Sequence, residues 1–139
     1  MRKFEFRLQN ILEYRRMCEE WAKQEYVQAQ ARLLSGQAEL EGIRDRRRVT
    51  LESRPDRVDQ MIALESFLTR LDDEERAFHA GLSILGQEVE STRTHWLEAR
   101  QEAEAMQKLR DQAYEAWQVE AAREEQAEMD EYALRRRAA

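Results

Sequence analysis

Ser53-Arg54-Pro55-Asp56 is the stretch that decides the fold of this chain, because it holds the only proline in 139 residues. Proline inside a helix removes a backbone hydrogen bond and clashes with the preceding turn, but the first turn of a new helix tolerates it. We expect Ser53 to cap that new helix, with Asp56 as an acidic variant of the capping box. The stretch therefore predicts a turn at about residues 53–56, with one helix on each side.

Apolar residues recur at helical spacing on both sides of this turn. They step by three, four and seven residues, which keeps their side chains on one face of each helix. An average spacing of about 3.5 residues between apolar positions, sustained over so many turns, is typical of coiled-coil packing. The predicted seam consists of Leu8, Leu12, Ala22, Tyr26, Ala29, Leu33, Leu40 and Ile43 before the turn, and of Met61, Leu64, Leu68, Leu71, Phe78, Leu82, Leu85, Val89, Trp96, Ala99, Ala103, Met106, Ala113 and Trp117 after it.

These patterns predict an all-α fold, a long antiparallel two-helix coiled-coil hairpin with an overhanging C-terminal helix. We expect helix one at about residues 4–52 and helix two at about residues 56–136, together forming a single coiled-coil rod over residues 1–139. Two glycines within six residues, Gly81 and Gly86, weaken helix two, because each costs about 1 kcal/mol relative to alanine. A bend or second turn there, giving three helices, stays open as an alternative.

A turn near residue 54 also predicts which residues of the two helices face each other. Counting outward from the turn places Tyr26 beside Leu82 and Leu85. The same count places Phe4 near Met106, so that roughly the last 30 residues overhang without an internal partner. The overhang carries Trp117, Met129, Tyr132 and Leu134. An unpaired apolar helix face is frayed, self-associated or bound by another protein, and we favour partner binding.

A two-helix rod offers no cavity in which catalytic groups could converge, and the mixed charges argue against nucleic-acid binding. Charged residues make up 37% of the chain, but 23 basic and 29 acidic side chains are mixed along the helices and leave a net charge of only -6. The single cysteine, Cys18, excludes an internal disulfide, and His79 and His95 are too far apart along the chain to share a metal ion. We expect no enzyme activity, no cofactor, no metal, and no direct insertion into a membrane.

Both ends of the chain resemble one family. The opening Lys3-Phe-Glu-Phe-Arg-Leu-Gln-Asn-Ile-Leu-Glu-Tyr-Arg-Arg16 resembles the start of the flagellar export protein FliJ. Near the other end, Glu128-Met-Asp-Glu-Tyr-Ala133 followed by Arg135 is similar to that family's C-terminal pattern. The resemblance covers the whole chain.

The resemblance implies a cytoplasmic component of the flagellar type III export system, peripherally associated with the export apparatus of the inner membrane. Members of the family are antiparallel coiled coils similar in shape to the central stalk of rotary ATPases. Their two chain ends insert into a hexameric export ATPase and promote its ring assembly, and they couple it to the export gate and escort export chaperones. The implied partners are therefore the hexameric ATPase, the export-gate membrane protein and the chaperones, with a monomer when free.

The same resemblance implies two sets of site residues. The candidate export-gate contact consists of Leu40, Ile43, Phe67 and Leu71. The candidate ATPase-binding overhang and termini consist of Phe4, Phe6, Trp117, Met129, Tyr132, Leu134 and Arg135. Plain seam packing is the alternative for the first set, except for Phe67, which is expected off the seam. Two other functions stay open: the stalk of a virulence-type III secretion system, and a generic dimeric coiled-coil scaffold.

Overall fold

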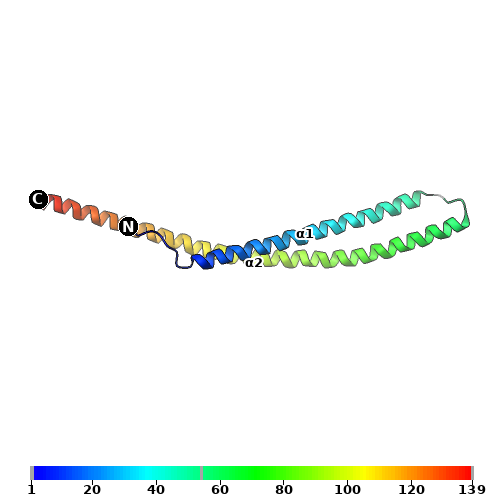
Figure 1. Cartoon of the computed structure of the whole chain (residues 1–139), viewed down its shortest axis with the longest axis horizontal. Helices are drawn as coiled ribbons and strands as arrows, with labels where there is room; N and C mark the ends of the chain where they lie inside the picture. Colours follow the sequence, from blue (N-terminus) through cyan, green and yellow to red (C-terminus); the bar gives the residue numbers. More distant parts are fainter. Residues whose placement is uncertain (1, 54, 139) are drawn as a thin grey trace. The chain divides into compact units, whose positions relative to one another are not determined.

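The computed structural model describes residues 2–53 and 55–138, and two helices hold nearly all of them. Helix α1 spans Gln9–Glu52 and helix α2 spans Val58–Ala138 (Figure 1). The helices pack against each other, and the described ranges contain no strand. The predicted all-α helical hairpin is therefore confirmed. Arg54, in the middle of the predicted turn, lies outside the described residues.

Helix α2 passes through Gly81 and Gly86 without a break, so the three-helix alternative is wrong. Each glycine costs about 1 kcal/mol in a helix interior. A second turn would cost more, because it would expose neighbouring apolar side chains such as Leu82 and Leu85, and burying one such side chain contributes about 1.5–3 kcal/mol. Continuous packing therefore outweighs the local weakness.

The connection between the helices differs from the predicted turn. The Ser53 N–H donates to the Thr50 carbonyl at 3.1 Å, so Ser53 closes the last turn of α1 and does not cap α2. The first hydrogen bond of α2 runs from the Met61 N–H to the Arg57 carbonyl at 3.0 Å. Pro55 lies between these two ends, outside both helices. Helix α2 thus begins two residues later than predicted.

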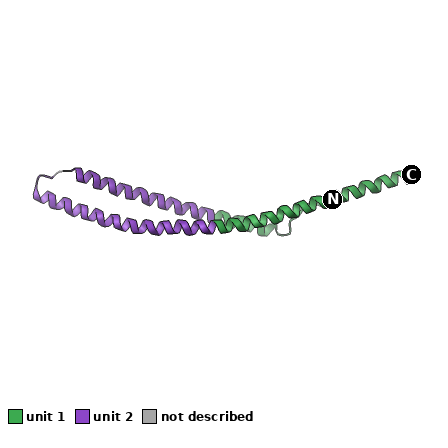
Figure 2. Cartoon of the chain, turned by 180° about the vertical axis from the view of Figure 1, so that it is seen from behind, with its two compact units in different colours: residues 1–21, 97–139 green, residues 22–96 purple. Residues whose placement is uncertain are grey.

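The chain divides into two compact units, each built from parts of both helices (Figure 2). Unit 1 comprises residues 1–21 and 97–139, and unit 2 comprises residues 22–96. Unit 2 is a hairpin in which the most deeply buried side chains are aliphatic. Its buried apolar side chains are Ala22, Ala29, Leu40, Ile43 and Leu71, all of which the spacing of apolar residues predicts.

The residues that face each other in unit 2 are not those predicted. Tyr26 stacks on Trp96, with ring centroids 5.5 Å apart and planes at 27°. Leu82 and Leu85 lie instead opposite Gly36, where an added Cβ would be 2.7 Å from Leu82 Cδ2 and 3.5 Å from Leu85 Cδ1. Tyr26 therefore meets α2 about three helical turns further along than expected.

The non-helical connection explains this shift. An extended residue advances about 3.3 Å, compared with about 1.5 Å in a helix. The six steps from Glu52 to Val58 can therefore carry the chain up to about 20 Å, and α2 starts beyond the end of α1 (Figure 1). The prediction assumed a tight turn, which would have set the start of α2 directly beside the end of α1.

Ion pairs across the seam hold this arrangement in unit 2. Arg32 pairs with Glu88 at 2.6 Å. Nearer the connection, the Arg47 guanidinium pairs with Asp72 at 2.6 Å and with Glu75. The hydrogen bond from Arg47 is the largest of the effects that lower the pKa of Glu75. These contacts favour the observed alignment of the helices over the predicted one, because each joins side chains that the predicted alignment would separate.

Candidate protein-interaction site

Unit 1 holds most of the residues expected at a partner-binding site, and it begins as an ordinary helix pair. The α1 residue Leu12 is fully buried, and Ala103 of α2 is also buried. Arg15 of α1 pairs with Glu102 of α2 at 2.5 Å, and Arg16 donates to Gln107. This part of unit 1 resembles unit 2 in its construction.

On the N-terminal side of α1, the segment that packs against α2 is no longer helical. Residues 2–8 precede α1, which begins at Gln9 and not at about residue 4 as predicted. We call residues 2–8 the N-terminal segment. It enters α1 through a turn in which the Gln9 N–H donates to the Phe6 carbonyl at 3.1 Å.

The N-terminal segment is attached to α2 through Phe4. The Phe4 ring meets Tyr114 edge-on, with centroids 5.1 Å apart and planes at 76°, and its centroid is 5.9 Å from that of Trp117. The guanidinium carbon of Arg110 lies 5.5 Å from the Phe4 centroid, a cation–π contact. Tyr114 and Trp117 stack on each other at 5.8 Å. We call these four residues the aromatic clasp.

The aromatic clasp corrects two predictions. Phe4 lies beside Tyr114 and Trp117, not near Met106, and Trp117 has an internal partner although it was expected to have none. Phe4 reaches further along α2 than predicted because residues 2–8 are not helical. An extended segment advances about twice as far per residue as the predicted helix would. A signal was present in the sequence: Phe4 and Phe6 alternate with charged residues, and a period of two is typical of extended chain.

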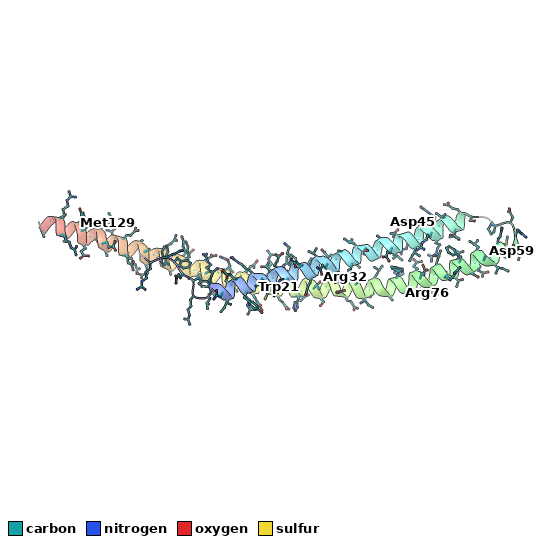
Figure 3. All side chains as sticks on the ribbon, in the orientation of Figure 1. Trp21, Arg32, Asp45, Asp59, Arg76 and Met129 are labelled. Atoms are coloured by element: carbon teal, nitrogen blue, oxygen red, sulfur yellow. The ribbon has the colours of Figure 1, made fainter. Side chains whose placement is uncertain are left out.

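The remaining part of α2, residues 122–138, is exposed throughout. We call it the free end of α2. Its large apolar side chains, Met129, Tyr132 and Leu134, are each about two-thirds exposed. Figure 3 shows Met129 on a stretch of α2 that no second segment accompanies. The prediction of an unpaired apolar overhang is confirmed for these three residues.

Charge on the free end is arranged in two bands. Glu124, Glu125, Glu128 and Asp130 form an acidic band in which the structure gives no ion pair to any of the four within the described ranges. Residues 135–137 are all arginines and lie in the last turn of α2, where positive charge complements the helix dipole. Arg135 pairs within the helix with Glu131 at 2.8 Å. A partner therefore meets separate negative and positive surfaces here.

The candidate export-gate residues lie in unit 2, and most of them are covered. Leu40, Ile43 and Leu71 are buried in the seam, so their side chains have little surface to offer a partner. Phe67 is half-buried beside a shallow depression that Pro55 also lines, and the guanidinium carbon of Arg70 is 5.9 Å from its ring centroid. Of the four residues, Phe67 alone presents substantial surface, and its contact with the gate stays a prediction.

Neither a metal cluster nor a membrane span is found in residues 2–53 and 55–138. No three His, Cys, Asp or Glu side chains in these ranges are grouped so that they could hold a metal ion. No helix in them is both long and apolar enough to cross a bilayer.

Comparisons with known proteins identify the family. The family model described as "Flagellar FliJ protein" matches residues 4–139. No curated protein and no solved structure matched the chain. The family match includes the aromatic clasp, the free end of α2 and nearly all of the remaining chain. The chain therefore belongs to the flagellar FliJ family.

Proposed function

We propose that this protein is a non-enzymatic, central-stalk-like component of the flagellar type III export apparatus. It binds the hexameric export ATPase, promotes assembly of the ATPase ring, couples the ring to the export gate and escorts export chaperones. It acts in the cytoplasm, peripherally associated with the export apparatus at the inner membrane. Family membership supports the association with flagellar export. The observation that carries the ATPase-binding role is the free end of α2.

The free end has the physical properties of a helix that is completed by a partner. A single helix of this length is marginally stable in water unless tertiary packing supports it. Residues 122–138 extend for about 25 Å and expose three large apolar side chains, and no other segment among the described residues covers them. Contact with the inner surface of a ring would bury these side chains and support the helix. A central stalk needs such a projecting helix.

The turn end of unit 2 supports the second part of the proposal. Phe67 provides a half-buried aromatic side chain with Arg70 beside it, and both aromatic residues and arginine are enriched at protein interfaces. We assign the export-gate contact to this neighbourhood. The buried residues Leu40, Ile43 and Leu71 support the contact by holding the helices together.

A titration of the protein into its cognate export ATPase tests the proposal. We expect the protein to stimulate ATP hydrolysis and to promote ring formation. An ATPase activity assay measures the first effect, and sedimentation measures the second. Wild-type protein that neither binds the ATPase nor changes its assembly would contradict the stalk role.

A matched pair of variants locates the contact. Leu134 and Leu34 are both 66% exposed, but Leu134 lies on the free end and Leu34 lies in unit 2. We expect Leu134→Ala to weaken ATPase binding about five- to tenfold, because the contact would bury much of the Leu134 side chain, and complete burial of such a side chain contributes about 1.5–3 kcal/mol. Leu34→Ala should bind as the wild type does. Equal affinities for the two variants would show that the free end is not the contact.

A further inference from the structure

One face of α2 in unit 1 is covered by the protein's own N-terminal segment. The face consists of Tyr114, Trp117 and Ala121, which follow each other at steps of three and four residues and therefore share one side of the helix. Phe4 lies against the two aromatic rings, and Arg2 lines a depression together with Trp117 and Ala121. The covered face ends where the free end of α2 begins.

The N-terminal segment is attached to α2 through side-chain contacts and not through backbone hydrogen bonds. In the described part of the chain, the backbone hydrogen bonds of the N-terminal segment that lie outside the helices run to the start of α1, from Gln9 to Phe6 and from Leu12 to Leu8. No such bond joins the segment to α2. Its attachment consists of the Phe4 ring contacts, the Arg110 cation–π contact and apolar packing. Aromatic and cation–π contacts of this kind are individually modest, and they oppose the entropy cost of ordering the segment.

The charges around the covered face are complementary to the segment. Glu120 and Glu124 line the same depression as Arg2, and Lys3 adds a second positive charge next in sequence. A ligand with a basic end and an aromatic side chain two or three residues further on therefore satisfies both the acidic rim and the stacked rings. The N-terminal segment is one ligand of this kind.

We propose that the face formed by Tyr114, Trp117 and Ala121 is a second partner-binding surface, which the N-terminal segment occupies in the free protein. The partner segment has the same chemistry: short, extended and basic, with an aromatic side chain that replaces Phe4. Release of the N-terminal segment joins this face to the free end, because Tyr132 lies three helical turns beyond Ala121 on the same side of α2. The inference rests on the proposed function in taking the export ATPase as the source of the partner segment.

Phe4 has a different role here from the one that the family resemblance implies. The family resemblance implies that Phe4 contacts the ATPase, whereas a Phe4 that covers Tyr114 and Trp117 competes with the ATPase for this face. The two roles predict opposite effects of Phe4→Ala. As a contact, the loss of the ring would weaken binding; as a competitor, the loss of the ring would strengthen binding.

The first test compares open, closed and locked forms of the full-length protein. Phe4→Ala opens the segment, and Phe4→Tyr keeps the ring and serves as the matched control. Arg2→Cys with Glu120→Cys, in a Cys18→Ala background, lets a short bis-maleimide linker lock the segment onto α2, because both positions line one depression. The same double-cysteine protein without linker is the control for the lock.

We expect Phe4→Ala to bind the ATPase about three- to tenfold more tightly than the wild type, since the binding-competent fraction rises when a competing contact is removed. Phe4→Tyr should match the wild type, and the locked protein should bind at least threefold more weakly than its unlinked control. Unchanged or weaker binding by Phe4→Ala, or a lock without effect, would overturn the inference.

The second test does not involve the ATPase. A peptide of residues 1–8 is added at about millimolar concentration, where weak complexes populate, to the full-length Phe4→Ala protein, and the Trp117 indole signal is followed by NMR. We expect a shift that weakens with salt and that a Phe4→Ala peptide does not produce. The locked protein should not respond. Absence of a shift with the unaltered peptide would overturn the binding surface, whereas a shift together with no ATPase binding by any variant would refute the proposed function alone.

Discussion

Units 1 and 2 are built from the same two helices but differ in what covers the apolar face of α2. In unit 2 a second helix covers it, and the buried side chains, among them Leu40, Ile43 and Leu71, are aliphatic. In unit 1 the first turns of α1 cover one part of this face and the N-terminal segment covers the next part, whereas the free end of α2 is not covered by any other described residue. The large side chains there are aromatic and half-buried, or exposed, as in the aromatic clasp and the free end.

The difference indicates where stability and binding reside. Buried aliphatic side chains contribute about 1.5–3 kcal/mol each when fully removed from water, so the seam of unit 2 supports a permanent pairing of helices. Half-buried aromatic rings held by few contacts support pairing that a competitor can replace. We therefore expect substitutions in unit 2 to change the free energy of unfolding, and substitutions at the end of unit 1 to change binding.

The largest expected effect on stability is that of Ile43→Ala. Ile43 is 1% exposed in the seam of unit 2, and its truncation leaves a cavity between the helices. We expect the free energy of unfolding to fall by about 3 kcal/mol. A urea titration followed by far-UV circular dichroism measures this change.

The matched control for this substitution is Leu34→Ala in the same helix. Leu34 is exposed, so its truncation removes little buried surface and should change the free energy of unfolding by less than about 0.5 kcal/mol. A loss below about 1 kcal/mol for Ile43→Ala would mean that unit 2 is not the more stable region.

A smaller effect is expected from two glycine substitutions in unit 2. At Gly86 an added Cβ meets no atom within 4 Å, so Gly86→Ala should raise the free energy of unfolding by about 1 kcal/mol through helix propensity. At Gly36 the added Cβ would lie 2.7 Å from Leu82 Cδ2, so Leu82 must move and part of the gain is lost. Urea titrations of both variants should therefore rank Gly86→Ala above Gly36→Ala. The reverse order would show that the helices approach less closely at Gly36.

The ion-pair network of unit 2 predicts a dependence on pH. The hydrogen bond from Arg47 lowers the pKa of Glu75 below its ordinary value of 4.5. A carboxylate with a lowered pKa stabilises the folded state above its ordinary pKa, and this contribution is lost as the pH falls through the lowered value. The melting temperature of the wild type should therefore exceed that of Glu75→Gln at neutral pH, and the difference should shrink below about pH 4.5.

A neighbouring carboxylate provides the control for this prediction. Glu74 lies next to Glu75, and the described residues contain no ion pair with it. Glu74→Gln should change the melting temperature less than Glu75→Gln does at neutral pH. A difference between wild type and Glu75→Gln that stays constant from about pH 7 to pH 3 would show that Arg47 does not act through the charge of Glu75.

The spacing of apolar residues was sufficient to predict the two helices and the seam positions. Leu12, Ala29 and Ile43 are all buried where a helical period places them. This part of the fold depends on local periodicity, which a sequence displays directly. Family resemblance at the two chain ends was confirmed by the match over residues 4–139.

The alignment of the helices could not be predicted in the same way. It depends on how far non-helical residues travel, and a few such residues between the two helices or before α1 shift the pairing by several helical positions. A regular repeat of apolar residues tolerates such shifts, because each apolar residue of one helix can pack equally well against several apolar residues of the other. Interhelical ion pairs such as Arg32 with Glu88 favour one alignment of the helices. The sequence does not show which residues form these pairs, because each charged side chain has many possible partners of opposite charge.

The smallest expected effect on stability is that of Tyr132→Ala on the free end. Tyr132 is 67% exposed, so the free energy of unfolding should change by less than about 0.5 kcal/mol, while ATPase binding weakens. Unaltered stability with lost binding is the combination that separates a partner-binding residue from a structural one. Measurement at several protein concentrations sharpens the result. Destabilisation by Tyr132→Ala that grows with concentration would mean that the free end pairs with a second copy, as a dimeric scaffold requires, and the contrast between the two units would then hold only for the isolated chain.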